Sequence, residues 1–281
     1  MVNQKKKRIS YIVFSLLAFI PVIIILFPLI WMLPSAFKGI EEIWELPAHW
    51  LPNTFTSNFP QIFEFDYNGG TFIKSLFFTL GVSVTATILG LFVNILAAYA
   101  FARNNFRFKK LFWVYMVCAM FVPGITIQLT SIKVVSMLNM TDTIFVLIIP
   151  GLANSYTIFF LRQFFLNVPK ALGEAAEIDG ASNFRICFGI YVPQVVTPLV
   201  ITGMGMFMGN WNSYIWPTLT IVDNTEDMTM IMQMMSTINK YFSDDYGAVI
   251  SSSIIVMIIP LTLYALLSKY IIEGATLTGL K

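Results

Sequence analysis

The chain has 281 residues, of which 57% are hydrophobic and 11% are charged. An ordinary soluble domain carries about 25% charged residues, so this composition excludes that class and predicts an integral membrane protein. A net charge of +2, with the cations scattered along the chain, also argues against binding to nucleic acid.

Residues that could support catalysis are scarce in the sequence. The single histidine, His49, has no second histidine or cysteine near it, so neither a metal site nor a histidine-based triad is expected. Cys118 and Cys187 are expected to be structural and not to form a disulfide with each other. The glycine-rich P-loop pattern is absent, so the chain is not expected to hold ATP by such a loop. Because a constellation of nucleophile, base and metal ligands is also missing, we predict that the chain is not an enzyme and holds no cofactor or metal itself.

Six apolar runs are each long enough to cross a bilayer core of about 30 Å as a helix. They cover residues 9–33, 75–102, 111–132, 143–161, 192–222 and 248–268. We therefore expect an all-α integral membrane fold, with six transmembrane helices in a single domain over residues 1–281. The first run is too long for the apolar part of a signal peptide, so we expect it to be retained, with kinks at Pro21 and Pro28.

Positive charge is divided unevenly among the segments that flank these runs. The side that holds both termini and the second and fourth connections carries thirteen of the 17 lysines and arginines. The four on the opposite side are Lys38, Lys74, Lys133 and Lys240. The positive-inside rule therefore predicts that the N- and C-termini are both cytoplasmic, which agrees with an even number of spans.

The outer side is expected to hold two long segments, at about 34–74 and 223–247. The second contains a methionine-rich run. An adaptable methionine surface suits either a partner protein or packing on the helix ends, and composition does not separate these two interpretations.

The connection over residues 167–191 cannot lie in lipid, because each of its charges would cost roughly 3 kcal/mol at the membrane centre. Pro169 is typical of a first helical turn and Gly180 of the residue after a helix end, so a short helix is predicted between them. Ser182 is a suitable N-cap for a second helix running toward Pro193. Gly180 is thus expected to form the bend between the two helices.

On the first of these helices, three- and four-residue spacing brings Ala175, Ala176 and Asp179 close together. Small side chains edged by acids permit close approach by another surface. From the residues alone, two interpretations stay open: a solvated amphipathic connector, or a lever pushed by a partner protein.

The same loop carries a family resemblance. Glu174, Ala175 and Ala176 are followed after three residues by Gly180, and after nine more by Ile190, Val192 and Pro193. This order closely resembles the EAA loop of permease subunits of binding-protein-dependent ABC importers, with Val192 where leucine is usual. The sequence from Asp179 to Ser182 is most similar to that of the carbohydrate-importing branch. The C-terminal tail is similar to that of the smaller, six-helix permease of maltose-type systems.

The resemblance implies a type I ABC importer permease fold in a bacterial cytoplasmic membrane. It implies a second permease subunit, on a separate chain, two cytoplasmic subunits that bind ATP and Mg, and an extracellular or periplasmic sugar-binding protein. The residues it assigns to ATPase coupling are Glu174, Ala175, Ala176, Asp179 and Gly180. Those it assigns to contact with the binding protein are Asn239, Lys240, Tyr241, Asp244 and Asp245.

Polar residues inside the spans are few, and amides beside aromatic rings suit the recognition of sugar hydroxyls. The residues that we expect along the substrate pathway are Asn154, Asn210, Trp211, Asn212 and Tyr214. The competing interpretation is that such amides join helices to one another, which we favour for Asn94. The spacing of Gly205 and Gly209 is typical of close helix packing.

No chain of buried acids or bases crosses the spans, which argues against a proton-coupled carrier. The leading hypothesis is a permease subunit of an ATP-driven sugar importer. The alternatives are a permease of the same kind for another solute and, less favoured, a membrane enzyme or a self-contained channel.

Overall fold

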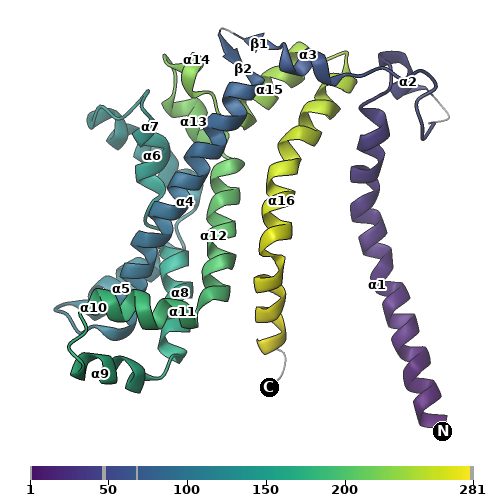
Figure 1. The fold of residues 1–281 in the computed structure, drawn as a ribbon. Coiled ribbons are helices and arrows are strands. Elements are labelled where there is room, and N and C mark those ends of the chain that lie inside the picture. The colour runs from purple at the N-terminus through teal and green to yellow at the C-terminus, as the bar shows by residue number, and fades with distance from the viewer. Residues whose placement is uncertain (1, 46–48, 68, 279–281) are drawn as a thin grey trace. The chain divides into compact units, whose positions relative to one another are not determined.

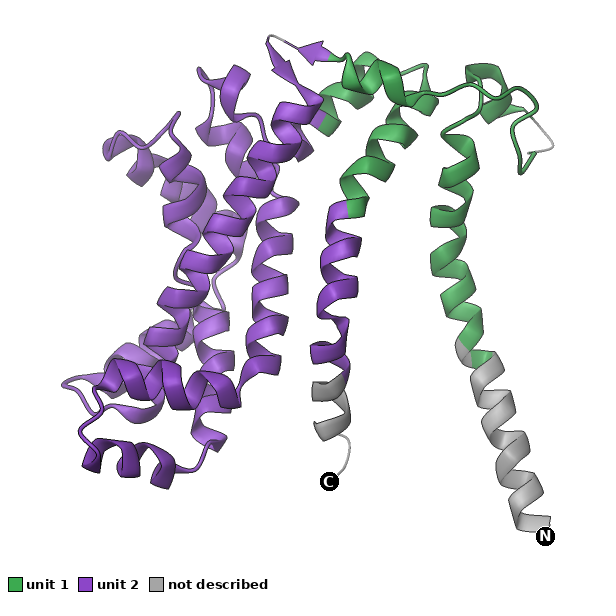
Figure 2. Cartoon of the chain, in the orientation of Figure 1, with its two compact units in different colours: residues 1–65, 235–258 green, residues 66–234, 259–281 purple. Residues whose placement is uncertain are grey.

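The computed structural model describes residues 2–45, 49–67 and 69–278, and these residues are mostly helical. Of the predicted cytoplasmic cations, Lys281 and the side chains of Lys5 to Arg8 lie outside the described part. The chain divides into two compact units, Met1–Phe65 with Met235–Ile258 (unit 1) and Asp66–Met234 with Ile259–Lys281 (unit 2) (Figure 2).

Unit 1 combines the first part of the chain with a segment near its C-terminal end. Its elements are α1 (Val2–Ser35), α2 (Ile40–Trp44), α3 (Phe59–Phe63), the last part of α15 (Ile231–Tyr241) and the first part of α16 (Tyr246–Thr278). The buried amide of Asn58 donates hydrogen bonds of 2.9 Å to the carbonyl oxygens of Ala36 and Lys38. A Cβ atom on Gly247 would lie 2.4 Å from that amide nitrogen, so glycine is required for the start of α16 to reach it. Helix α1 continues through Pro21 and Pro28.

Unit 2 is built around one long helix, α4 (Phe72–Arg103), which packs along α8 (Ser155–Asn167) and α12 (Val196–Trp211). Before α8 come the hairpin β1 (Asp66–Tyr67) and β2 (Gly70–Thr71), α5 (Lys109–Ala119), α6 (Gly124–Met137), α7 (Ile144–Ile148) and the 3-10 turn η1 (Ile149–Gly151). After η1 the chain forms α8 (Ser155–Asn167), α9 (Lys170–Ile178), α10 (Asn183–Ile186), the π-helical turn η2 (Cys187–Tyr191), α11 (Val192–Gln194), α12 (Val196–Trp211), α13 (Ile215–Thr220) and α14 (Thr225–Met228).

Two hydrophobic clusters lie along α4. One contains Tyr99, Phe165 and Tyr191 and lies where α4, α8 and η2 meet. The other contains Val82, Val146 and Ile221 and joins α4 to α7 and to the residue after α13. Helices α9 and α10 lie near one end of unit 2 and the β1–β2 hairpin near the other (Figure 1).

The predicted apolar runs are helical, but three of them are not single straight helices. Among the described residues, α4 and Tyr246–Ile272 of α16 are long and apolar enough to cross a membrane alone. Three bent pairs reach that length only together: α5 with α6 at 108°, α7 and η1 with α8 at 43°, and residues 183–194 with α12 at 91°. The described apolar part of α1, Phe19–Ser35, is shorter.

Proline explains where two of these runs break. Pro123 stands directly before α6, and Pro150 lies inside the 3-10 turn that separates α7 from α8. A proline lacks the N–H group that an unbroken helix needs for its hydrogen bond to the carbonyl group four residues earlier. The third break is at Val195, between Pro193 and Pro198, where φ and ψ of −127° and 34° leave the helical region.

Candidate functional site: the α9 loop and the α8–α12 groove

The local structure predicted for the loop over residues 167–191 is confirmed. Pro169 precedes α9, which covers nine residues, and Gly180 has a φ of +77°, which favours glycine. The hydroxyl of Ser182 accepts a hydrogen bond of 3.4 Å from the backbone N–H of Arg185 at the start of α10. The loop is therefore two helices joined by a left-handed bend.

The inner face of α9 rests on the ring of Tyr191. Gly173 is buried there, and a Cβ atom at this position would lie 2.8 Å from the hydroxyl oxygen of Tyr191. Ala176, one turn further on, is half-buried against the same cluster. The ring itself is fixed by edge contacts with Tyr99 and Phe165, with centroid separations of 5.4 and 6.2 Å. Gly173, which the sequence reasoning did not single out, therefore sets how closely α9 approaches.

Arg103, at the end of α4, holds the segment that leads into α9. Its guanidinium donates to the carbonyl oxygens of Phe165 and Val168, at the C-terminal end of α8, and lies 4.8 Å from the ring centroid of Tyr191. A cation at this end of a helix complements the partial negative charge of the free carbonyl groups. This contact joins α4 to the last turn of α8 immediately before α9 begins.

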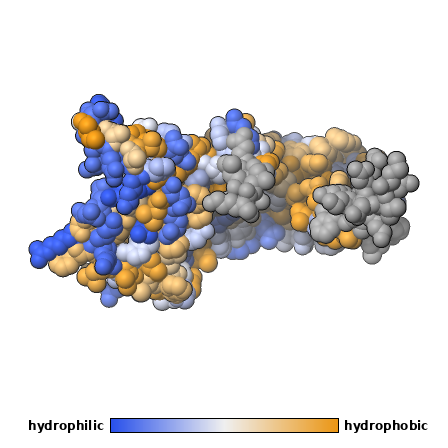
Figure 3. Space-filling view, turned by 90° about the horizontal axis from the view of Figure 1, so that it is seen from below, coloured by the Kyte–Doolittle hydropathy of each residue, from blue (hydrophilic) through white to orange (hydrophobic). Residues whose placement is uncertain are grey.

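The outer face of α9 is exposed. Glu174, Ala175 and Asp179 all face solvent in this chain, and the side chain of Ile178 is 87% exposed. Seen from the α9 end, the surface of unit 2 is largely hydrophilic, with hydrophobic side chains among the polar ones (Figure 3). Of the predicted coupling residues, four are therefore accessible, counting Gly180, while Ala176 faces inward.

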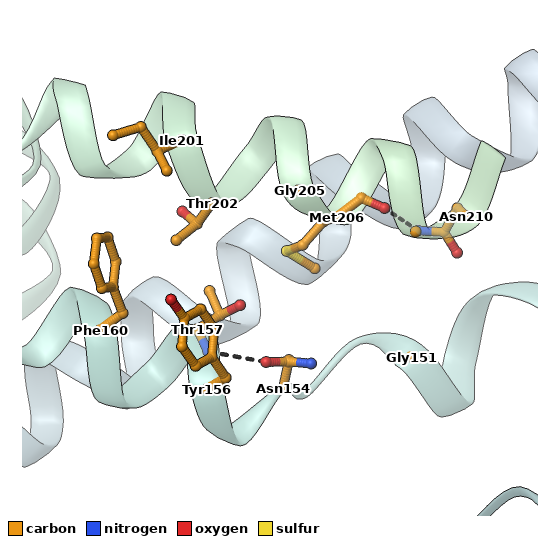
Figure 4. Close-up of a pocket in the computed structure, with 11 residues that line it drawn as sticks. Gly151, Asn154, Tyr156, Thr157, Phe160, Ile201, Thr202, Gly205, Met206 and Asn210 are labelled. Atoms are coloured by element: carbon orange, nitrogen blue, oxygen red, sulfur yellow. Dashed lines mark hydrogen bonds between the residues drawn. The ribbon is translucent and has the colours of Figure 1, made fainter. Parts of the chain in front are cut away.

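A groove of about 520 Å³ lies between α8 and α12. Figure 4 shows Tyr156 and Phe160 of α8 on the side that faces Thr202 and Met206 of α12. The rings of Tyr156 and Phe160 stack with a centroid separation of 6.0 Å, forming an aromatic wall beside hydroxyl and amide groups. The remaining lining residues are Gly151, Asn154, Thr157, Ile201, Gly205, Gly209 and Asn210.

A second cavity, of about 230 Å³, lies between α6, η1 and α13. It shares Gly151 and Asn210 with the first, and its polar lining includes Gln128, Ser131 and Ser213. The two cavities therefore adjoin at Asn210. Together they present amides and hydroxyls from α6, α8 and α12.

Asn94 joins α4 to the chain break before α8. Its amide nitrogen donates to the carbonyl oxygens of Gly90 and Leu152, at 2.6 and 2.8 Å, and its oxygen accepts from the N–H of Asn154 at 2.8 Å. The Asn154 side chain then accepts from the N–H of Thr157 at 2.9 Å and caps α8. Asn94 thus joins helices, as expected, while Asn154 both caps a helix and lines the groove.

The predicted pathway residues separate into two groups. Asn154 and Asn210 line the groove, although the Asn210 amide also donates to the Met206 carbonyl at 2.9 Å. Trp211 is only 1% exposed and stacks on Phe207, so it lies outside both cavities. Asn212 and Tyr214 are exposed and line neither cavity.

Sequence reasoning missed the aromatic wall. The four-residue spacing of Tyr156 and Phe160, directly after the capping residue Asn154, could have indicated it. The packing role expected for Gly205 and Gly209 is wrong for contacts within this chain. Both glycines line the groove, and no atom lies within 4 Å of where their Cβ atoms would be.

The residues expected to contact a binding protein surround the end of α15, in unit 1. Asn239, Lys240, Tyr241 and Asp244 are exposed. Asp245 instead caps α16, because its carboxylate accepts from the N–H groups of Gly247 and Ala248 at 3.1 and 3.4 Å. Four of the five residues are accessible to a partner, and the fifth has a structural role.

Helices apolar enough to cross a membrane, a short helix with an exposed face and a polar groove are together the features of a membrane transport permease. Residues 86–276 match the family described as "Binding-protein-dependent transport system inner membrane component". The chain belongs to this family, and the resemblance read from the loop is confirmed.

Individual relatives are similar over nearly their whole length. The inner membrane ABC transporter permease protein YcjP of Escherichia coli (strain K12) is 30% identical over 271 residues, covering 92% of each chain. The arabinooligosaccharides transport system permease protein AraQ of Halalkalibacterium halodurans is 25% identical, covering 95% of this chain and 94% of its own length. A crystal structure of a bacterial ABC transporter involved in import of the acidic polysaccharide alginate matches with a TM-score of 0.77 at 21% identity, over 94% of this chain and 96% of that one. This last similarity establishes the type I importer permease fold.

Proposed function

We propose that this chain is one permease subunit of an ATP-driven importer of sugars or oligosaccharides. It lies in the cytoplasmic membrane with both termini in the cytoplasm. It forms the pathway with a second, different permease chain and receives its solute from a binding protein outside the membrane. ATP and Mg are held by two cytoplasmic ATPase subunits, and this chain holds no cofactor.

The observation that carries this proposal is the direct connection between α9 and the groove through the single helix α8. Arg103 of α4 holds the α9 end of α8, and Asn94 of the same helix holds the groove end. In the proposed mechanism, closure of the ATPases on ATP moves α9, and α8 carries this movement to the groove that it lines.

The sugar part of the proposal rests on the chemistry of the groove and on the relatives. Amide and hydroxyl groups match the donors and acceptors of sugar hydroxyls, and the wall of Tyr156 and Phe160 offers the flat apolar surface on which a sugar ring stacks. AraQ is named for the transport of arabino-oligosaccharides. On the outer side, Asn239, Lys240, Tyr241 and Asp244 are proposed to meet the sugar-binding protein.

The coupling role of α9 is tested by charge reversal on its exposed face. We expect Glu174→Lys to reduce co-purification of the ATPase subunits and ATP-dependent uptake by about tenfold, while the chain still inserts in the membrane. The matched control is Glu64→Lys, which makes the same charge change at an exposed position in unit 1. Co-purification and uptake that are unchanged in Glu174→Lys contradict the docking role.

A further inference from the structure

The walls of the groove and of the adjoining cavity are polar but uncharged. Within the described parts of the chain, neither the α8–α12 groove nor the adjoining cavity is lined by a carboxylate, an ammonium, a guanidinium or an imidazole group. The polar groups on their walls are amides, hydroxyls and one indole. The relatives' names, by contrast, include both a neutral class of oligosaccharide and an acidic polysaccharide.

Three of the cations of unit 2 are directed away from the groove. Arg103 is bound to carbonyl groups at the far end of α8. Arg162 donates from Nε to the carbonyl oxygen of Phe101 at 3.0 Å, and its guanidinium lies 3.9 Å from the ring centroid of Trp113. Lys133 follows Ser131 by two residues on α6, which turns it about 200° away from the cavity wall.

Helix termini do not supply a full counter-charge either. The start of α8 faces the groove, but the Asn154 side chain already accepts one of its N–H groups and Asn94 accepts that of Asn154 itself. The end of α12, at Asn210, brings the opposite partial charge to the boundary between the two cavities. The positive and negative helix ends therefore offset each other along the groove.

We propose that the solute that moves along this groove is an uncharged saccharide. An anion moved from water into such a groove loses hydration that no ionised side chain replaces, whereas a neutral sugar exchanges its water for amides, hydroxyls and an aromatic wall. The inference rests on the proposed function, which it narrows from sugars in general to neutral ones.

The electrical character of the groove is measurable in the assembled importer by cysteine labelling. In a Cys118→Ser background, Gly205→Cys places a thiol in the groove without a clash and Ser213→Cys places one in the second cavity. The control is Ser57→Cys, at an exposed loop position. Each variant is labelled with neutral 2-hydroxyethyl methanethiosulfonate and with anionic 2-sulfonatoethyl methanethiosulfonate.

We expect the ratio of neutral to anionic labelling rates to be at least about tenfold higher in the groove than at the control position. Adding Asn210→Lys to Gly205→Cys should return the ratio toward the control, because it places a cation on the wall. A groove ratio equal to or below the control overturns the proposal, since the assembled complex then supplies the cation that this chain lacks.

Uptake separates this inference from the proposed function. The complete importer in proteoliposomes, with its binding protein, is supplied with neutral hexose and pentose oligomers or with uronic-acid oligomers of equal length. ATP-dependent uptake of the neutral oligomers supports the inference, and uptake of the uronic-acid oligomers overturns it. If the labelling ratio is high but neither class enters, the sugar-importer function fails while the neutral character of the groove stands.

Discussion

The two ends of α8 are held by the same neighbouring helix but by different chemistry. At the α9 end, Arg103 of α4 binds two carbonyl groups with a full positive charge. At the groove end, Asn94 of the same helix binds Leu152 and Asn154 with a neutral amide. A full charge is costly in the membrane interior, whereas an amide joins helices there without one. These contacts fasten both ends of α8 to α4, and the neutral anchor adds no charge beside the groove.

The largest effect is expected from tightening the contact at the α9 end. Gly173→Ala places a methyl group 2.8 Å from the Tyr191 hydroxyl, and that ring is fixed by its neighbours. Overpacking of this kind costs typically 1–3 kcal/mol, so we expect α9 to shift and ATP-dependent uptake to fall about tenfold. Gly189→Ala is the matched control, because no atom lies within 4 Å of that Cβ position. Equal uptake by the two variants would show that the position of α9 is unimportant.

The charged anchor is tested next. Arg103→Gln removes a guanidinium from two carbonyl groups, and hydrogen bonds from a charged donor contribute about 1.5–3 kcal/mol. We expect the free energy of unfolding of unit 2 to fall by about 2 kcal/mol, measured by thermal denaturation in detergent. Arg103→Lys should recover only part of the lost free energy of unfolding, because an ammonium group lacks the planar arrangement of N–H donors that a guanidinium has. Arg107→Gln, at an exposed position in the connection between α4 and α5, serves as control. A loss of the same size in Arg107→Gln contradicts a specific anchor at Arg103.

A smaller effect is expected at the neutral anchor. Asn94→Leu keeps the branched shape and the number of side-chain heavy atoms but leaves the Leu152 carbonyl and the Asn154 N–H without their partner. Hydrogen bonds between membrane helices contribute about 0.6 kcal/mol on average, so the loss should be about 1 kcal/mol. We also expect faster hydrogen exchange at Asn154 and reduced uptake with normal ATPase co-purification.

The control for this anchor is Thr87→Val, which removes a hydrogen bond that stays within α4. Exchange at Asn154 that is as slow in Asn94→Leu as in Thr87→Val would contradict the joining role of Asn94.

The smallest effect is expected at Asp142, which lies in the loop before α7 and joins this loop to the segment after α13. Desolvation opposes ionisation, but backbone N–H groups of Val222, Asp223 and Asn224 donate to the carboxylate at 2.6, 2.8 and 3.3 Å and lower its pKa below the ordinary value of 3.8. A lowered folded-state pKa stabilises the fold above the unfolded value, and the contribution disappears as the pH falls through the folded value.

We therefore expect Asp142→Asn to be slightly less stable than the natural chain at pH 5–8 by thermal denaturation, with the difference shrinking below about pH 3.8. A difference that persists unchanged at acid pH would mean that the charge of Asp142 is not what joins this loop to the segment after α13.

The α9 loop could be predicted from the sequence because its signals are local. Pro169, Gly180 and Ser182 each act on the backbone within a few residues, so the bend and both helices followed from their order. The apolar runs could also be predicted from the sequence, because a candidate membrane span is defined by its length and hydrophobicity. Family membership followed from the spacing of the same loop.

The groove depended on contacts between residues far apart in the chain. Asn94 satisfies backbone groups about sixty residues away, and this allows the run over 143–161 to break and expose Asn154 and Tyr156 to the groove. The placement of Trp211 was also decided by packing, because its ring turns onto Phe207 and away from the polar face. The sequence by itself determined which segments are apolar enough to enter a membrane and which loop is too charged to do so. Only the tertiary structure decided where the spans break, because a break is stable only where a neighbouring helix supplies partners for the freed backbone groups.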